Sequence, residues 1–271
     1  MEAAFFDLDK TVIAKASVAA FGRTLYDRGL ITKRILLKAA VTHLIFLQLG
    51  AGHRRLERIR QSTLTITRGW NQAEMERIVR EALRDVLEPI IYREALELIE
   101  AHQVAGRKVV IISSAPQEIV TPMAEFLGAD EAIGSRTCVD AHGRYTGELQ
   151  FYAYGPAKAE AVERMAKEQE IDLSRSYAYS DSHTDEPLLS AVGNPVAVNP
   201  DKELIRIARA HKWPITQFSH PMPPAEVAAR RLRIANVLFA ATTVGMVGLT
   251  AGYWELHKKT KVLRGQLERR R

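Results

Sequence analysis

A short apolar run opens the chain and ends in an acid. Residues 3–6 are apolar and are followed by Asp7, which is typical of a buried strand with a polar group at its carboxyl end. Further strands are predicted at residues 108–112, 177–180 and 195–198, where β-branched and aromatic residues gather. Segments with helical spacing separate them. Because strands that alternate with helices form parallel sheets covered on both faces, the pattern predicts an α/β, Rossmann-like core.

Other elements of this core are shorter. The sequence Asp-Ala-His-Gly at residues 140–143 is typical of a turn. We expect strands on either side of it, at residues 133–139 and 145–149, and a last strand at 213–218. Helices are predicted over residues 94–102, 157–169, 187–191 and 202–210, and Pro116 is predicted to be the first residue of another helix.

Residues 15–94 contain no clear strand and are predicted to form a helical cap, inserted between residues 1–14 and 95–220 of the core. Within the cap, residues 35–49 are strongly apolar, with few polar interruptions. This stretch is shorter than the roughly 20 residues that span a bilayer. Two interpretations stay open. It is either a core helix of the cap, or a helix that lies on a membrane surface or lines an apolar substrate path.

A second apolar segment, residues 234–254, has the length of a membrane-spanning helix. It carries no charge, and at about 1.5 Å per residue it matches a bilayer core of about 30 Å. We therefore expect a linker at 221–233, a transmembrane helix and a basic tail at 255–271; the alternative is a buried C-terminal helix. The N-terminus has no signal-peptide pattern, so we expect a single-pass protein of the cell membrane with a cytoplasmic catalytic domain.

The positive charge of the chain is concentrated in that tail. The formal net charge is +6, but ten of the 38 basic residues and two of the 32 acids lie from Arg230 onward. The preceding part is slightly acidic, which argues against a nucleic-acid-binding surface on the fold. The single cysteine, Cys138, excludes an internal disulfide and a cysteine-based zinc site.

Two carboxylates follow the first predicted strand. In the sequence Asp7-Leu8-Asp9-Lys10-Thr11, both acids can reach a site at the carboxyl end of the sheet, where α/β folds bind ligands. One carboxylate can attack a phosphorus atom, and the other can protonate the leaving oxygen and later activate water. The alternative is a turn that contains two acids and has no catalytic role.

Candidate phosphate-binding groups follow the strand at 108–112. The serines Ser113 and Ser114 precede a predicted helix, and a hydroxyl beside free N–H groups there suits a phosphate. The alternative is a serine that only caps the helix. Lys158, near the start of the helix at 157–169, is a further candidate cation if it points into the same crevice; otherwise it is an ordinary solvated lysine.

Another acid pair follows the strand at 177–180. Asp181 and Asp185 lie four residues apart and offer the oxygen ligands that hard cations prefer. The alternative for Asp185 is to cap the helix that follows. His183, between them, is not expected to be a metal ligand.

Taken in order, these four segments resemble the motifs of the haloacid dehalogenase superfamily of phosphatases. The resemblance covers about residues 3–220 and points to the branch with a helical cap after the first motif, which includes phosphoserine phosphatases. It implies a magnesium-dependent phosphomonoester hydrolase. Asp7 would be the nucleophile that forms an aspartyl-phosphate, and Asp9 would be the general acid and base.

The resemblance also implies roles for the remaining candidates. Thr11, Ser113 and Lys158 would hold the phosphate, with Ser114 as the alternative to Ser113. Mg²⁺ would be bound by four residues, which are Asp7, Asp9 through its carbonyl, Asp181, and Asp185 as a ligand or a support for one.

The substrate is left open between three interpretations. Residues 35–49 and 234–254 favour a membrane-anchored enzyme for an amphiphilic or lipid phosphomonoester, and the segment 179–189 is similar to a phosphatidylglycerophosphatase motif. A phosphoserine phosphatase or another small-metabolite phosphatase is the alternative. Against phosphoserine, those enzymes carry a glutamate in the cap, whereas this sequence has no acid between Asp9 and Asp27. The third interpretation is a non-catalytic membrane adaptor. The oligomeric state is not predicted.

Overall fold

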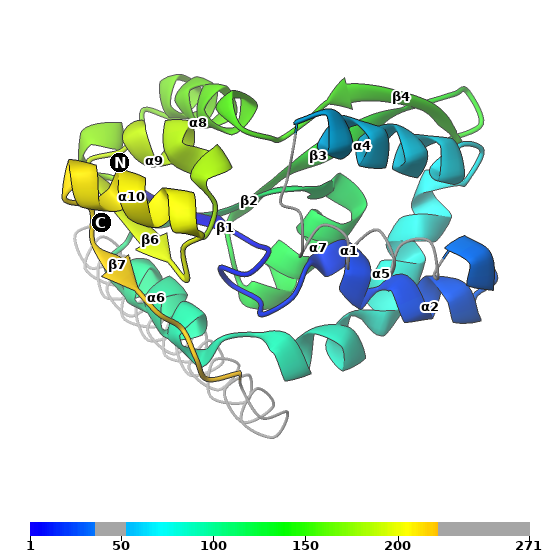
Figure 1. Ribbon diagram of the computed structural model, residues 1–271, viewed down its shortest axis with the longest axis horizontal. Helices are drawn as coiled ribbons and strands as arrows, with labels where there is room; N and C mark the ends of the chain where they lie inside the picture. Colours follow the sequence, from blue (N-terminus) through cyan, green and yellow to red (C-terminus); the bar gives the residue numbers. More distant parts are fainter. Residues whose placement is uncertain (36–52, 222–271) are drawn as a thin grey trace, which may run out of the picture. The chain divides into compact units, whose positions relative to one another are not determined.

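The computed structural model describes residues 1–35 and 53–221. Its centre is a seven-stranded sheet with the strand order β4-β3-β2-β1-β5-β6-β7 (Figure 1). The strands are β1 (Ala3–Asp7), β2 (Lys108–Pro116), β3 (Glu131–Val139), β4 (Tyr145–Phe151), β5 (Tyr177–Ser180), β6 (Asn194–Val198) and β7 (Ile215–Thr216). The chain therefore begins in the middle of the sheet, with β2 and β5 parallel to β1 on either side.

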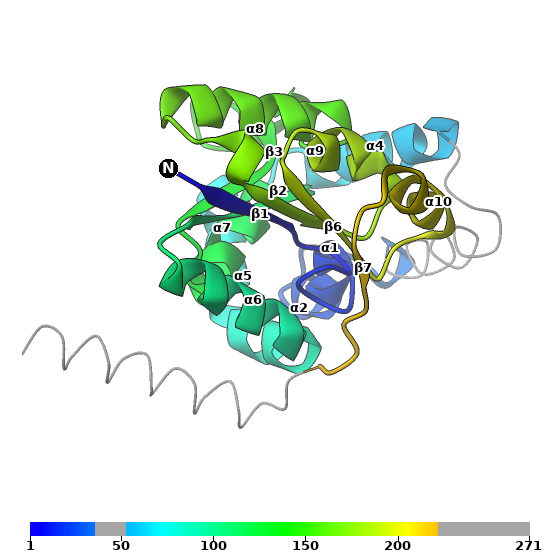
Figure 2. The same ribbon diagram turned by 90° about the vertical axis from the view of Figure 1, so that its left-hand side faces the viewer.

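Helices cover both faces of this sheet, with α8, α9 and α10 on one side and α6 and α7 on the other (Figure 2). In the core these are α6 (Arg93–Val104), α7 (Gln117–Leu127), α8 (Pro156–Glu168), α9 (Glu186–Ser190) and α10 (Lys202–His211), with 3-10 turns η2 (Leu173–Arg175) and η3 (His183–Asp185). The cap region contains α1 (Ser17–Ala20), α2 (Gly22–Asp27), α4 (His53–Thr67), α5 (Gln72–Leu87) and η1 (Glu88–Ile90).

The first strand is apolar on both faces because it is buried on both. Ala3 and Phe5 pack in the cluster that holds α8, α9 and α10, whereas Ala4 and Phe6 pack in the cluster on the other side. Successive side chains of a strand point to opposite faces, so a strand covered on both sides becomes a continuous apolar run rather than an alternating one.

The prediction of a parallel sheet is wrong at one edge. β4 pairs antiparallel with β3, so the sheet is mixed. The physical reason is the turn at residues 140–143, since a few residues can join antiparallel neighbours but a parallel crossover needs a dozen or more. The last strand is also shorter than predicted, at Ile215–Thr216.

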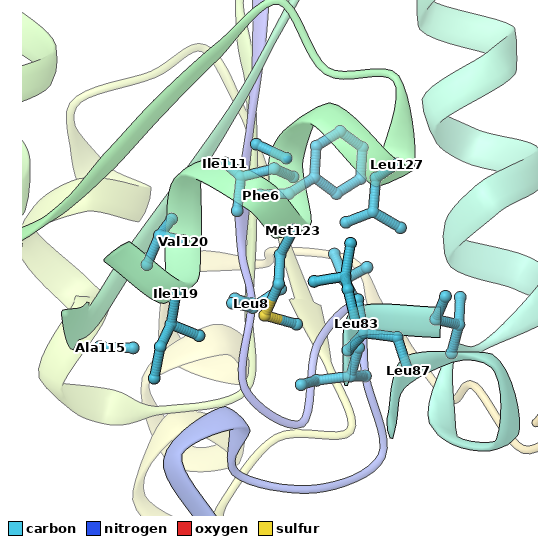
Figure 3. Packing of buried hydrophobic residues seen from close by; sticks show 14 of the residues in the cluster. Phe6, Leu8, Leu83, Leu87, Ile111, Ala115, Ile119, Val120, Met123 and Leu127 are labelled. Atoms are coloured by element: carbon cyan, nitrogen blue, oxygen red, sulfur yellow. The ribbon is translucent and has the colours of Figure 1, made fainter. Parts of the chain in front are cut away.

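The described part of the cap is packed firmly onto the core. Helix α5 lies against α7, and its buried side chains Leu83 and Leu87 share one apolar cluster with Met123 and Leu127 (Figure 3). Residues 1–222 accordingly form one compact unit. The proposed boundaries between cap and core at residues 15 and 94 stay a prediction.

The two connections between cap and core run side by side. Ile13 and Ile91 form an antiparallel bridge. Ala14 donates its N–H to the carbonyl of Ile90 at 2.7 Å, and Tyr92 donates its N–H to the carbonyl of Val12 at 3.0 Å. Residues 12–14 and 90–92, at the two predicted ends of the cap, therefore lie against each other.

The predictions about membrane contact fall almost entirely outside the described residues. This holds for the apolar stretch at 35–49 after its first residue, for the linker at 221–233 after its first residue, and for the segments 234–254 and 255–271. Within residues 1–35 and 53–221, no helix has both the length and the apolar character needed to cross a bilayer.

Candidate active site

The first acid pair lies where β1 ends. Asp7 is the last residue of β1, opposite Ile112 of β2 in the register of the sheet. The chain then turns sharply at Lys10, whose φ of 61° is in the left-handed region that residues other than glycine seldom adopt. Such strain persists where the surrounding structure holds the loop in place, as it often does at functional sites.

A lysine joins two buried carboxylates at this point. The Nζ atom of Lys158 lies 2.6 Å from Oδ1 of Asp7 and 2.7 Å from Oδ2 of Asp185, and all three side chains are less than 10% exposed. Lys158 is in the first turn of α8. The residue before this helix, Gly155, has a φ of 57° and a ψ of −129°, a combination that essentially only glycine adopts. Lys158 is therefore not an ordinary solvated lysine, since its ammonium points to both acids.

Negative charge exceeds positive charge in this cluster. Burial raises the pKa of Asp7 well above its ordinary range, and Lys158 opposes this, while the charges of three further acids, Asp185, Asp181 and Asp9, add to it. Burial also lowers the pKa of Lys158, but the charges of Asp185 and Asp7 raise it by more, so the net shift is upward. The lysine therefore stays protonated, and the carboxylates lack enough cationic partners.

The two acids of the second pair, Asp181 and Asp185, have different surroundings. Asp185 occupies the capping position of α9, but its side chain caps nothing; Oδ2 instead accepts from Ser180 Oγ at 2.7 Å and from Lys158. The capping alternative is thus excluded. The pKa of Asp181 is raised to about 7. Burial is the main cause, the positive charge of Lys10 opposes the rise, and the negative charge of Asp185 adds to it.

Asp201 holds the loop that carries both acids, and the sequence analysis missed it. Its Oδ2 accepts from the backbone N–H of His183 at 3.0 Å and lies 2.8 Å from His183 Nδ1, and its own N–H donates to the carbonyl of Asp181 at 2.8 Å. The sequence could have identified Asp201 as a site residue, because it follows a predicted strand and precedes a predicted helix at the same edge of the sheet.

The candidate phosphate-binding hydroxyls lie beside these acids. Ser113 is buried, one residue beyond the position paired with Asp7, and its Oγ accepts from the N–H of Ala115 at 3.1 Å. Ser114 is exposed. Neither serine caps α7, which starts after Pro116 rather than at it. The Thr11 hydroxyl is fully buried and has no hydrogen-bond partner among the described residues.

These donors fit magnesium better than zinc. Within the described parts of the chain no three His, Cys, Asp or Glu side chains are grouped to hold a metal alone. Mg²⁺, however, is commonly bound by one or two carboxylates together with water and substrate phosphate. Asp7 and Asp181 offer such a pair, in a cluster whose negative charge Lys158 only partly neutralises. The roles of all these residues stay predictions.

We expect Lys158→Met to destabilise the protein by about 3 kcal/mol or more near neutral pH, because it leaves two buried carboxylates without their cation. The cost should shrink as the pH falls and the carboxylates take up protons. Denaturant unfolding without metal measures both effects. The double variant Lys158→Met/Asp185→Asn is the control, since it removes one of the stranded charges and should be more stable than the single variant. A cost below about 0.5 kcal/mol at every pH would contradict the assignment.

Comparison with known proteins adds the family to this geometry. The sequence profile of the haloacid dehalogenase-like hydrolases matches residues 4–190. A Streptomyces azureus protein named inhibition of morphological differentiation protein is 47% identical over 90% of this chain and 91% of its own. A probable phosphatase of Mycobacterium tuberculosis is 42% identical over 90% and 87%. A protein of the same organism named phosphoserine phosphatase is 34% identical over 80% and 70%.

A solved structure supports the fold alone. A Bordetella pertussis protein of unknown function superposes with a TM-score of 0.69 at 24% identity, over 79% of this chain and 97% of its own. The family profile covers both acid pairs and Lys158, and the Streptomyces azureus protein and the probable phosphatase each align with nine tenths of the sequence. The chain is therefore a phosphoric monoester hydrolase and belongs to the haloacid dehalogenase-like hydrolases.

Proposed function

We propose that the protein hydrolyses a small, water-soluble phosphomonoester through a covalent intermediate on Asp7. The observation that carries the proposal is the Lys158 ammonium, 2.6 Å from Asp7 at the carboxyl end of the central strand. It holds the attacking carboxylate in place and provides positive charge where a phosphate dianion would otherwise be repelled. The buried hydroxyl of Thr11, which has no partner among the described residues, supports a phosphate at this position.

The proposed reaction has two steps. An oxygen of Asp7 attacks phosphorus, the bond from phosphorus to the leaving oxygen breaks, and Asp9 gives that oxygen a proton. Water then attacks the aspartyl-phosphate, Asp9 takes a proton from the water, and inorganic phosphate leaves with Asp7 regenerated. Lys158 and Ser113 hold the phosphoryl oxygens in both steps.

Mg²⁺ is the proposed cofactor. Asp7, Asp181 and the carbonyl of Asp9 would hold it, and it would supply positive charge between the phosphate and the carboxylates. Asp185 is assigned to positioning Lys158, since its Oδ2 is engaged by Lys158 and Ser180.

The proposal of a soluble substrate is supported by the relatives. One of them is named phosphoserine phosphatase, and phosphoserine is accordingly the first substrate to test. The sequence lacks the cap acid of those enzymes, so another small phosphomonoester is the alternative. The amphiphilic substrate and the membrane location stay predictions from sequence, because the segments on which they depend lie outside the described residues. Membership of a hydrolase family argues against the non-catalytic adaptor.

The nucleophile is tested by Asp7→Asn. The amide retains the shape of the side chain but cannot attack phosphorus, so phosphate release should fall by about 10³-fold or more. The matched control is Asp140→Asn, the same change in an exposed turn, which should leave the rate unchanged. Near-normal turnover by Asp7→Asn would exclude the covalent mechanism.

Removal of the metal should abolish activity, and Mg²⁺ should restore it. Ca²⁺ should restore it poorly, because its larger and looser coordination shell places the phosphate differently. A second readout needs no substrate, since a ligand that binds only the folded state raises the melting temperature. Mg²⁺ should do so for the wild type and less for Asp181→Asn. Full activity after exhaustive chelation would rule out a metal role.

A substrate panel decides between the two substrate classes. Phosphoserine, other small phosphomonoesters and lipid phosphomonoesters with tails of increasing length are compared by kcat/KM on the full-length protein. We expect a small substrate to give the highest value, because a relative 34% identical to this chain is named phosphoserine phosphatase. A steady rise of kcat/KM with tail length would instead favour the amphiphilic substrate.

A further inference from the structure

The cap region reaches the second acid of the first motif through its backbone. Ser17, the first residue of α1, donates its N–H to Oδ1 of Asp9 at 2.8 Å. Ser17 is fully buried. Burial raises the pKa of Asp9, and both the N–H and the hydroxyl of Ser17 oppose that rise. Asp9 and Ser17 are eight residues apart in the chain, and residues 12–14, which pair with residues 90–92, lie between them.

An N–H donor makes the two oxygens of a carboxylic acid unequal. A protonated oxygen carries its own hydrogen and is a poor acceptor, so the oxygen that faces the Ser17 N–H is the one that stays unprotonated. Any proton on Asp9 is therefore held on Oδ2. The same hydrogen bond restricts rotation of the carboxyl group, because Oδ1 must keep its distance from a fixed backbone nitrogen.

We propose that Ser17 is a positioning residue for proton transfer, and this rests on the proposed function of Asp9 as general acid and base. Its N–H holds Oδ1, so Oδ2 carries the proton and faces the leaving oxygen. When the bond from phosphorus to that oxygen breaks, the proton passes from Oδ2 to the leaving group. In the second step Oδ2 takes the proton from the attacking water, which returns Asp9 to its starting form.

The backbone around Ser17 allows its N–H to be removed by mutation. Proline is well tolerated as the first residue of a helix, where no intrahelical hydrogen bond is lost. The preceding residue, Ala16, has φ of −66° and ψ of 126°, the extended conformation that a following proline requires. Ser17→Pro therefore removes the donor to Asp9 with little cost to the helix. Ser17→Ala is the matched control, because it removes the hydroxyl and keeps the N–H.

The test compares two leaving groups on the full-length enzyme with Mg²⁺. p-Nitrophenolate leaves without a proton, whereas the alkoxide of phosphoserine or glycerol phosphate needs one. We expect Ser17→Pro to lower kcat/KM for the alkyl ester about tenfold more than for p-nitrophenyl phosphate, a part of the 10²–10⁴-fold that general acid catalysis provides. Ser17→Ala keeps the N–H and should therefore show a clearly smaller difference between the two substrates than Ser17→Pro. Asp9→Asn shows the full leaving-group effect for comparison.

A purely structural role would lower kcat/KM for both substrates equally, and that result, or no loss at all, would overturn the proposal. If Ser17→Pro fails to fold, as judged by its melting temperature, an amide-to-ester replacement at position 17 removes the same N–H without a ring and decides the question. A wild type that hydrolyses neither ester would contradict the proposed function, which is a separate outcome from a wild type that is active and a variant that shows no leaving-group effect.

Discussion

The arrangement of the site depends on the two contacts that the buried Lys158 ammonium makes with Asp7 and Asp185. Asp7 ends β1, Asp185 ends the turn η3 that follows β5, and Lys158 comes from the helix between them in the chain, 151 residues after Asp7. In an interior of low dielectric constant, none of these charges is tolerated alone. The contacts of Lys158 therefore stabilise the fold with the three elements in this register. The carboxylates still outnumber the ammonium, an excess that a phosphate-bound cation would relieve.

Much of this arrangement follows from local sequence. The run at residues 3–6 is uninterrupted because β1 lies between two helical layers, and an acid at its end has to lie at the edge where parallel strands bind ligands. Local sequence does not predict that the side chain of Lys158 is buried, because a lysine in the first turn of a helix is ordinarily solvated. Only the closeness of two carboxylates distant in sequence gives it its place.

Other features could not be derived from the sequence because they depend on tertiary contacts. Asp185 has the local pattern of a helix cap, but pairing with a buried ammonium is stronger than a capping hydrogen bond, so its carboxylate turns inward. Ser17 contacts Asp9 through its backbone N–H, and a backbone N–H leaves no trace in residue identity. The antiparallel pairing of β4 could have been predicted, since the short turn at 140–143 already excludes a parallel crossover.

The adjacency of the two cap connections has an evolutionary consequence. Because the bridge between Ile13 and Ile91 brings the ends of the inserted segment together, residues can be added or deleted between them without pulling the sheet apart. The freedom is uneven, however. Leu25 of α2 and Leu83 of α5 share an apolar cluster with Met123 of α7, so such changes should be confined to positions outside that cluster. Specificity in this chain would then diversify by changes between two segments whose pairing stays the same.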